Sequence, residues 1–200
     1  MPGKMKEQDY ASIRKMIECN VLHPVSSSLL PKGGHLKVHC PDGDTTPFEV
    51  ADFHTICKRA NKSVVCTHLI SVAGGPGGIP RKSPMHQLFY KDKQLGTVDQ
   101  FVFSFIEGAL HIKQGRVPNI ALIPHCPCGM ANLKNISVLE NFSLTFEAKD
   151  IIRNEFPNTF NSIRVMPHIN FEGYPEAIEG SNPFKLFVLR RAPFLEFLKT

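Results

Sequence analysis

The sequence predicts an α/β protein with a mostly parallel β-sheet and flanking helices. Segments with apolar residues at helical spacing alternate along the chain with short β-rich runs, a pattern typical of parallel strands joined by right-handed helical crossovers. The run Asn119–Pro124 is almost wholly apolar, as are strands that a parallel sheet buries on both faces. With 200 residues, of which 42% are hydrophobic, the chain is long enough for one full core.

The first part of the chain is predicted to hold two helices and two strands. Ile13, Met16, Ile17 and Val21 recur at three- and four-residue spacing, which indicates a helix with one apolar face. Turns rich in glycine and proline bound the two β-rich runs. In order, we expect a helix over 10–21, a strand over 35–40, a helix over 50–60 and a strand over 63–73, which ends in the glycine-rich run 74–78.

The second part opens with residues 78–96, which are polar and rich in proline and lysine, so we expect a surface insertion there. The next segment predicts an amphipathic helix whose apolar stripe consists of Phe101, Phe105, Ala109 and Ile112. After the helix over 98–113 we expect a strand over 119–124, a helix over 138–156 and strands over 162–166 and 184–190.

Two regions follow from this pattern. Residues 1–34 are predicted to form an N-terminal helical arm, and residues 35–200 a single α/β domain that also carries the metal site derived below.

Composition and charge exclude several classes of function. The longest apolar stretches are far shorter than the roughly 20 residues that span a bilayer, and no apolar segment follows the N-terminal lysines, so we expect a cytoplasmic protein without membrane association. The net charge is +5, from 23 basic and 18 acidic residues. Because the basic residues are scattered singly or in pairs, we expect no nucleic-acid partner.

The cysteines and histidines indicate a metal site. The segment His125-Cys126-Pro127-Cys128 offers a His-x-x-Cys pair whose side chains can reach one tetrahedral ion from a single turn. A third ligand must come from elsewhere, and Cys40 ends a predicted strand just as His125 follows one. Loops beyond the carboxyl ends of parallel strands gather in one crevice, so these residues are placed to meet. Two cysteines and one histidine are an established set for zinc with an open fourth position.

The other cysteines fit this set of ligands less well. Cys66, in Cys66-Thr67-His68, could replace Cys40 as a ligand, although it is expected within a strand. Cys126 has a spacing that turns it away from the ion. Cys19 and Cys57 are expected to be buried as small apolar side chains on helices.

The order of these motifs resembles that of the β-class carbonic anhydrases over roughly residues 35–191. The segments that carry the resemblance are Cys40-Pro-Asp42-Gly-Asp44, the strand and glycine loop from His68 to Gly75, and Ile120-Ala-Leu-Ile-Pro-His-Cys-Pro-Cys-Gly-Met130. The resemblance implies that Cys40, His125 and Cys128 bind Zn²⁺, and that zinc-bound hydroxide attacks carbon dioxide to form bicarbonate. It also implies that Asp42 is the catalytic residue that orients the water or moves its proton.

The resemblance has two further implications. The substrate pocket would be lined by Gly74, Gly75 and Gly129, and the chain would form a homodimer or a higher homo-oligomer. The sequence departs from the family at Asp44, where the family has an arginine that pairs with the preceding aspartate. Without that partner, we expect Asp42 to bind the zinc near neutral pH.

Three hypotheses remain open on the sequence. The first is a zinc lyase that hydrates carbon dioxide, or a relative that acts on a carbon–sulfur analogue. The second is a non-catalytic zinc-binding protein, which the Asp44 departure favours. The third is an anion- or nucleotide-binding module that uses the glycine-rich run 74–78, with the cysteines and histidines incidental.

Overall fold

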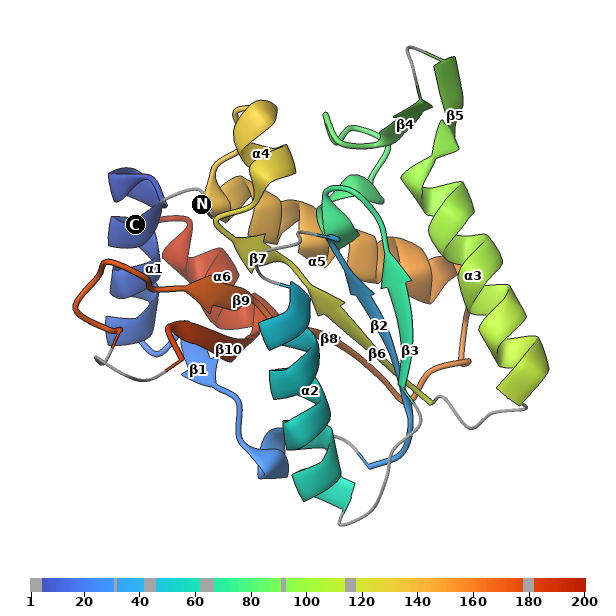
Figure 1. Cartoon of the computed structure of the whole chain (residues 1–200), viewed down its shortest axis with the longest axis horizontal. Helices are drawn as coiled ribbons and strands as arrows, with labels where there is room; N and C mark the ends of the chain where they lie inside the picture. Colours follow the sequence, from blue (N-terminus) through green and yellow to red (C-terminus); the bar gives the residue numbers. More distant parts are fainter. Residues whose placement is uncertain are drawn as a thin grey trace.

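The computed structural model shows an α/β fold in which a mostly parallel, mixed sheet lies between layers of helices (Figure 1). This confirms the α/β class with a mostly parallel sheet and flanking helices, whereas a fold like that of the β-class carbonic anhydrases stays a prediction from the motif resemblance. No helix among the described residues is both long and apolar enough to cross a membrane. The structure describes residues 5–30, 32–41, 46–61, 67–90, 93–113, 118–177 and 182–200.

The main sheet has the strand order β3-β2-β6-β8-β10-β9-β7, with β1 paired to β10. The pairs among β3, β2, β6 and β8 are parallel, and so is the pair of β7 with β9, whereas β10 is antiparallel to β1, β8 and β9. The strands are β1 Leu22–Pro24, β2 His35–His39, β3 Thr67–Ser71, β6 Asn119–Ile123, β7 His125–Cys126, β8 Ser162–Val165, β9 His168–Asn170 and β10 Phe184–Leu189.

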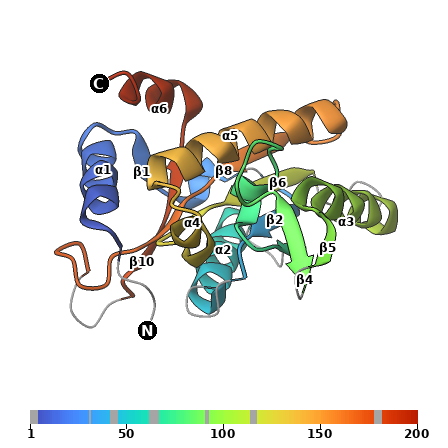
Figure 2. The same ribbon diagram turned by 90° about the horizontal axis from the view of Figure 1, so that it is seen from above.

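Helices cover both faces of the sheet (Figure 2). On one face, α3 and α5 bury apolar side chains of β2, β3, β6 and β8. On the other face, α2 packs Phe53 and Cys57 against Ala121 and Ile123 of β6. A third cluster joins α1, α5 and α6 to β9 and β10. The helices are α1 Glu7–Glu18, α2 Thr46–Asn61, α3 Val98–Lys113, α4 Gly129–Leu133, α5 Val138–Glu155 and α6 Arg191–Phe197.

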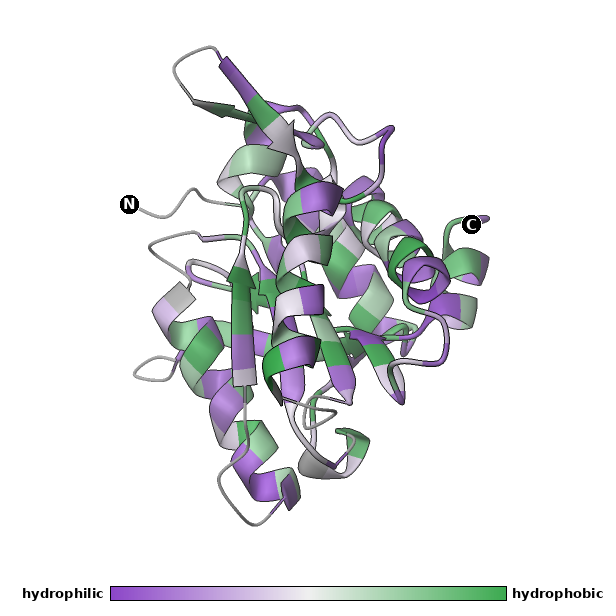
Figure 3. Ribbon diagram, turned by 90° about the vertical axis from the view of Figure 1, so that its right-hand side faces the viewer, coloured by the Kyte–Doolittle hydropathy of each residue, from purple (hydrophilic) through white to green (hydrophobic). Residues whose placement is uncertain are grey.

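The apolar stripe predicted for α3 is wrong in three of its four residues. Phe101, Phe105 and Ile112 are exposed, and only Ala109 belongs to the buried face. The residues that α3 packs against the sheet are Val98, Val102, Ile106 and Ala109, at the same helical spacing but on another side of the helix. Both stripes are apolar, so periodicity alone does not show which one faces the sheet. Figure 3 shows hydrophobic and hydrophilic residues mixed on the outward side of α3.

The prediction of a buried Cys19 is also wrong. Cys19 is exposed, because α1 ends at Glu18 rather than near Val21, and the chain then turns through Asn20 in a left-handed conformation. Cys57 is buried beneath α2, as expected for a small apolar side chain.

The segment before β2 packs on the main sheet and its helices. β1 pairs with β10, and α1 contributes Ile13 and Met16 to the same core cluster as Phe142 of α5. Val138 is the first residue of α5, and its backbone amide donates a hydrogen bond of 2.9 Å to the Asp9 carboxylate. A carboxylate at a helix N-terminus is favourable, because the first amides of a helix have no partners within it.

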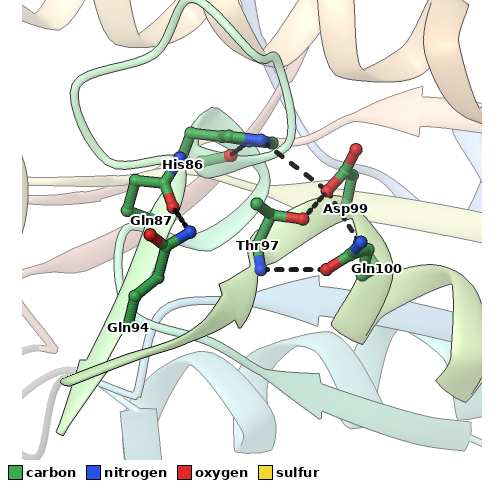
Figure 4. Close-up of polar contacts among 7 residues, drawn as sticks. His86, Gln87, Gln94, Thr97, Asp99 and Gln100 are labelled. Carbon is green, nitrogen blue, oxygen red and sulfur yellow. Dashed lines mark hydrogen bonds and ion pairs between the residues drawn. The ribbon is translucent and has the colours of Figure 1, made fainter.

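The predicted insertion at residues 78–96 begins at the end of a short 3₁₀ helix, Gly75–Gly78, and overlaps a two-stranded hairpin of β4 Gln87–Tyr90 and β5 Lys93–Thr97. The hairpin projects from the molecule above α3 (Figures 1 and 3). At the junction of the hairpin with α3, the Gln100 side chain accepts a hydrogen bond of 3.3 Å from the Thr97 amide. The Thr97 hydroxyl bonds to Asp99, and Asp99 lies 3.8 Å from His86 Nε2 (Figure 4).

A polar network lies buried between α2 and the strands β2 and β3. Lys37 Nζ is 2.6 Å from a Glu49 carboxylate oxygen, and both side chains are fully buried. His39 Nδ1 lies 3.2 Å from the same oxygen, and His39 Nε2 lies 2.6 Å from the Ser71 hydroxyl. Although burial opposes ionisation, the contacts with His39 and Lys37 outweigh it and hold the pKa of Glu49 below its usual value.

Candidate metal centre

Three potential metal ligands meet beyond the carboxyl ends of the neighbouring strands β2 and β6. The Cys40 sulfur, a His125 ring nitrogen and the Cys128 sulfur lie within 4.8 Å of one another, and all three residues are buried. Cys40 directly follows β2, His125 begins β7, and Cys128 immediately precedes α4. The chain therefore brings two separate segments together at a single point.

The pairing of β2 with β6 explains this meeting. The two strands are parallel neighbours, and their last residues, His39 and Ile123, lie opposite each other. Cys40 and the segment from Pro124 to His125 therefore leave the sheet at the same edge, at the carboxyl ends of adjacent strands (Figure 1). The His-x-x-Cys spacing then returns Cys128 to His125 through the turn at Pro127.

The glycine loop after β3 presses against Cys40. The Gly74 amide donates a hydrogen bond to the Cys40 sulfur, with a nitrogen–sulfur distance of 3.3 Å. Gly74 and Gly75 both have positive φ, of 81° and 58°. A Cβ at Gly75 would lie 3.0 Å from the Cys40 backbone nitrogen, so only glycine fits this position without movement of the chain.

The pKa values of the Cys128 and Cys126 thiols are shifted in opposite directions. A hydrogen bond with Cys40 holds the pKa of the Cys128 thiol well below its usual value; burial opposes this shift, and His125 adds to it. The thiolate is the form that binds metals. Burial, the negative charge of Asp9 and that of Cys128 instead raise the pKa of Cys126 well above its usual value. Cys126 packs in the core cluster around Ile169 and stands outside the Cys40–His125–Cys128 group.

The donor atoms fit a tetrahedral zinc ion in kind and approximately in spacing. Two sulfurs and one imidazole nitrogen are ligands that zinc prefers, and ideal tetrahedral coordination separates such donors by roughly 3.8 Å. The three atoms, all within 4.8 Å of one another, need only a small approach to reach that spacing. The buried group could therefore hold a metal ion, and its chemistry is compatible with zinc.

The structure places the remaining predicted site residues as follows. Gly74 and Gly75 are buried next to Cys40. Gly129 is exposed at the first position of α4, with no atom within 4 Å of a Cβ built there. Asp42 and Asp44, and the alternative ligand Cys66, lie outside the described residues.

Sequence reasoning left His39 without a role, although it directly precedes Cys40. The signal was present in the alternation of β2, which places His35, Lys37 and His39 on the face that α2 covers. The contact of 3.2 Å between His39 Nδ1 and Glu49 anchors the end of β2, directly before Cys40.

Comparison of the chain with models of protein families, with curated proteins and with solved structures finds no match. The assignment of a function therefore depends on the residues of the chain and on their geometry.

Proposed function

We propose that this chain binds one zinc ion through Cys40, His125 and Cys128 and catalyses the reversible hydration of carbon dioxide to bicarbonate. The observation that carries the proposal is the buried group of three ligands at the carboxyl ends of two adjacent parallel strands. The motif order that resembles the β-class carbonic anhydrases supports the same function, because it assigns the ligand role to these three residues.

The residues of the chain prepare the site in two ways. The lowered pKa of Cys128 favours the thiolate, whose negative charge attracts a dication. The Gly74 amide holds the Cys40 sulfur in position. When bound, zinc supplies Lewis acidity that makes hydroxide available near neutral pH. Asp42, two residues after Cys40, is the side chain proposed to orient water or to move its proton.

The first experiment measures metal content and activity separately. Protein purified without added metal should contain close to one zinc per chain by elemental analysis, and Cys128→Ser should lose most of it. Cys19→Ser is the matched control, because Cys19 is exposed and outside the group, and it should keep the wild-type zinc content. Full zinc content in a Cys40→Ser/Cys128→Ser double variant would overturn the proposed ligand set.

Activity is tested by stopped-flow hydration of carbon dioxide. If the Asp42 carboxylate coordinates the zinc because no arginine pairs with it, the wild-type rate should be low at neutral pH. The rate should rise with pH, because hydroxide then competes better with the carboxylate for the metal. Asp44→Arg should then increase the rate at neutral pH. A fast wild-type rate at neutral pH that Asp42→Ala leaves unchanged would refute the role of Asp42.

A second candidate, a non-catalytic zinc-binding protein, is favoured by the sequence at Asp44, where the family that the motifs resemble has an arginine that pairs with the preceding aspartate. Absence of turnover in both wild type and Asp44→Arg, with zinc fully bound, would support this candidate over the lyase.

A further inference from the structure

A pocket of about 380 Å³ lies along β8, which lines it from Ser162 to Val165. β10 leaves β8 there, because the two strands share only the pair Val165–Leu189, the last residue of each, before the chain enters α6. Ser162, at one end of this lining, lies opposite Asn119 at the amino end of β6, whereas His125 follows the carboxyl end of β6. The C-terminal half of α5 and the start of α6 also line the pocket. Figure 2 shows the two helices beside each other, and the rings of Phe146 and Phe194 are in contact, with centroids 5.5 Å apart.

The pocket is strongly cationic. Arg191 forms an ion pair of 2.6 Å with Asp150, and no other ion pair of these cations occurs within the part of the chain that the structure describes. Two further donors, Asn161 and Ser162, also line the pocket. Asp150, the partner of Arg191, supplies a single negative charge. Five basic side chains line the pocket: Lys149, Arg153, Arg164, Arg190 and Arg191.

Two of the basic side chains, Arg164 and Lys149, are partly desolvated, and the charges of neighbouring arginines act on both. Burial, and then the charge of Arg190, lower the pKa of Arg164. Burial, and then the charge of Arg153, lower the pKa of Lys149, although Asp150 opposes this. Arg164 is held in place, since its guanidinium donates to the Ser162 hydroxyl at 3.1 Å and to the Leu29 carbonyl. Positive charge is thus concentrated in a partly dry site without enough counter-charge, which an anion would relieve.

We propose that this pocket binds a small soluble anion that carries two or more phosphate groups. Guanidinium groups match phosphate oxygens with paired hydrogen bonds, and the four cations other than Arg191 suit a diphosphate or triphosphate in charge. The volume lies within the range of small-ligand pockets. A recessed pocket also admits the end of a small molecule more readily than the convex surface of a nucleic-acid duplex. The site is independent of the zinc-binding proposal, because it shares no residue with the metal centre.

The experiment is a calorimetric titration of the purified chain with inorganic pyrophosphate at an ionic strength of about 0.15 M, where long-range attraction is screened. Saturable binding of one pyrophosphate per chain is expected. The variant Arg153→Ala/Arg190→Ala should weaken it about tenfold or more, because it removes two charge-assisted contacts. Both side chains are exposed, so the variant should keep the wild-type circular dichroism spectrum.

The matched control is Lys93→Ala/Lys134→Ala, which removes the same charge from exposed positions on β5 and at the end of α4. It should leave pyrophosphate affinity unchanged. Equal weakening in both double variants, or no saturable binding by wild type, would overturn the proposal. So would binding only to vesicles that contain a phosphoinositide, or affinity for RNA that increases with its length while pyrophosphate does not bind.

Discussion

At the scale of single residues, Gly75 shows how the backbone makes room for the metal centre. Its φ is 58°, and a Cβ would lie 3.0 Å from the Cys40 nitrogen. Gly75→Ala should therefore lower the free energy of unfolding by about 2 kcal/mol and reduce the zinc content by displacing Cys40. Urea denaturation and elemental analysis measure the two effects.

Gly108→Ala is the control for this substitution. Gly108 lies within α3 with no atom within 4 Å of a Cβ, so alanine should stabilise the chain by about 0.5–1 kcal/mol. Equal stability and equal zinc content in the Gly75→Ala protein and the wild type would show that the loop is not tight around Cys40.

Glu49 provides the second prediction at this scale. Glu49→Gln leaves the fully buried Lys37 without its counter-charge, so it should cost about 3–5 kcal/mol in urea denaturation. Glu18→Gln, which breaks the exposed pair with Arg14, should cost about 0.5 kcal/mol or less. If the two variants lost similar amounts of unfolding free energy, burial would not be what makes the Lys37–Glu49 pair important for stability.

Glu49 also predicts how the stability of the fold depends on pH. Because the folded-state pKa of Glu49 lies below its usual value, its carboxylate stabilises the fold above the unfolded-state pKa of about 4.3. This contribution is lost as the pH falls through the lower folded-state value. Wild type should therefore lose stability below about pH 4 more steeply than Glu49→Gln.

At the scale of elements, α3 was predicted with the bounds that the structure has, yet with the wrong buried stripe. Ile106→Ala should cost about 2–5 kcal/mol, because Ile106 is fully buried against the sheet. Phe105→Ala should cost about 1 kcal/mol or less in a dilute sample, since Phe105 is 46% exposed. A larger loss for Phe105→Ala than for Ile106→Ala would reverse the assignment of the two faces.

Long elements with a clear period were the predictable part of the fold. β2, β6 and α5 lie within a few residues of their expected bounds, because each carries an uninterrupted pattern. The strands β1 and β9 were not predicted, because three residues are too few to show an alternation of apolar and polar side chains. Both strands are defined by their pairing with β10. The hairpin β4–β5 was hidden by its polar composition.

The candidate site was predictable to the extent that its residues follow strands. Cys40 and His125 could be placed at one sheet edge from the sequence, because parallel strands share the direction of their carboxyl ends. The network of Lys37, His39 and Glu49 could not, since it depends on which turn of α2 lies over β2. Contacts between a strand and the helix that covers it depend on tertiary packing, which the local pattern does not encode.

At the scale of the whole molecule, the association of chains remains a prediction from the motif resemblance. We expect a dimer or a larger assembly by sedimentation velocity. Exposed apolar side chains of the hairpin and of α3 offer an apolar surface for it: Phe89, Leu95, Phe101, Phe105 and Ile112. Leu95→Glu/Ile112→Glu should therefore yield monomers.

The control variant introduces two glutamates at exposed positions away from the hairpin and α3. Leu133→Glu/Leu198→Glu alters two exposed leucines of α4 and the end of α6, and should leave the assembly intact. A wild-type monomer at every concentration would refute the prediction of a dimer.

The pairing of β10 with β1, β8 and β9 also bears on how the chain is made. Leu22 lies opposite Leu189, so β1 emerges from the ribosome long before the strand that completes its hydrogen bonds. Cys40, His125 and Cys128 all emerge before β10 as well. The nascent chain thus displays its thiols to metal ions and to oxidants while the sheet is still open, and capture of an ion at that stage would protect these sulfurs until synthesis reaches β10.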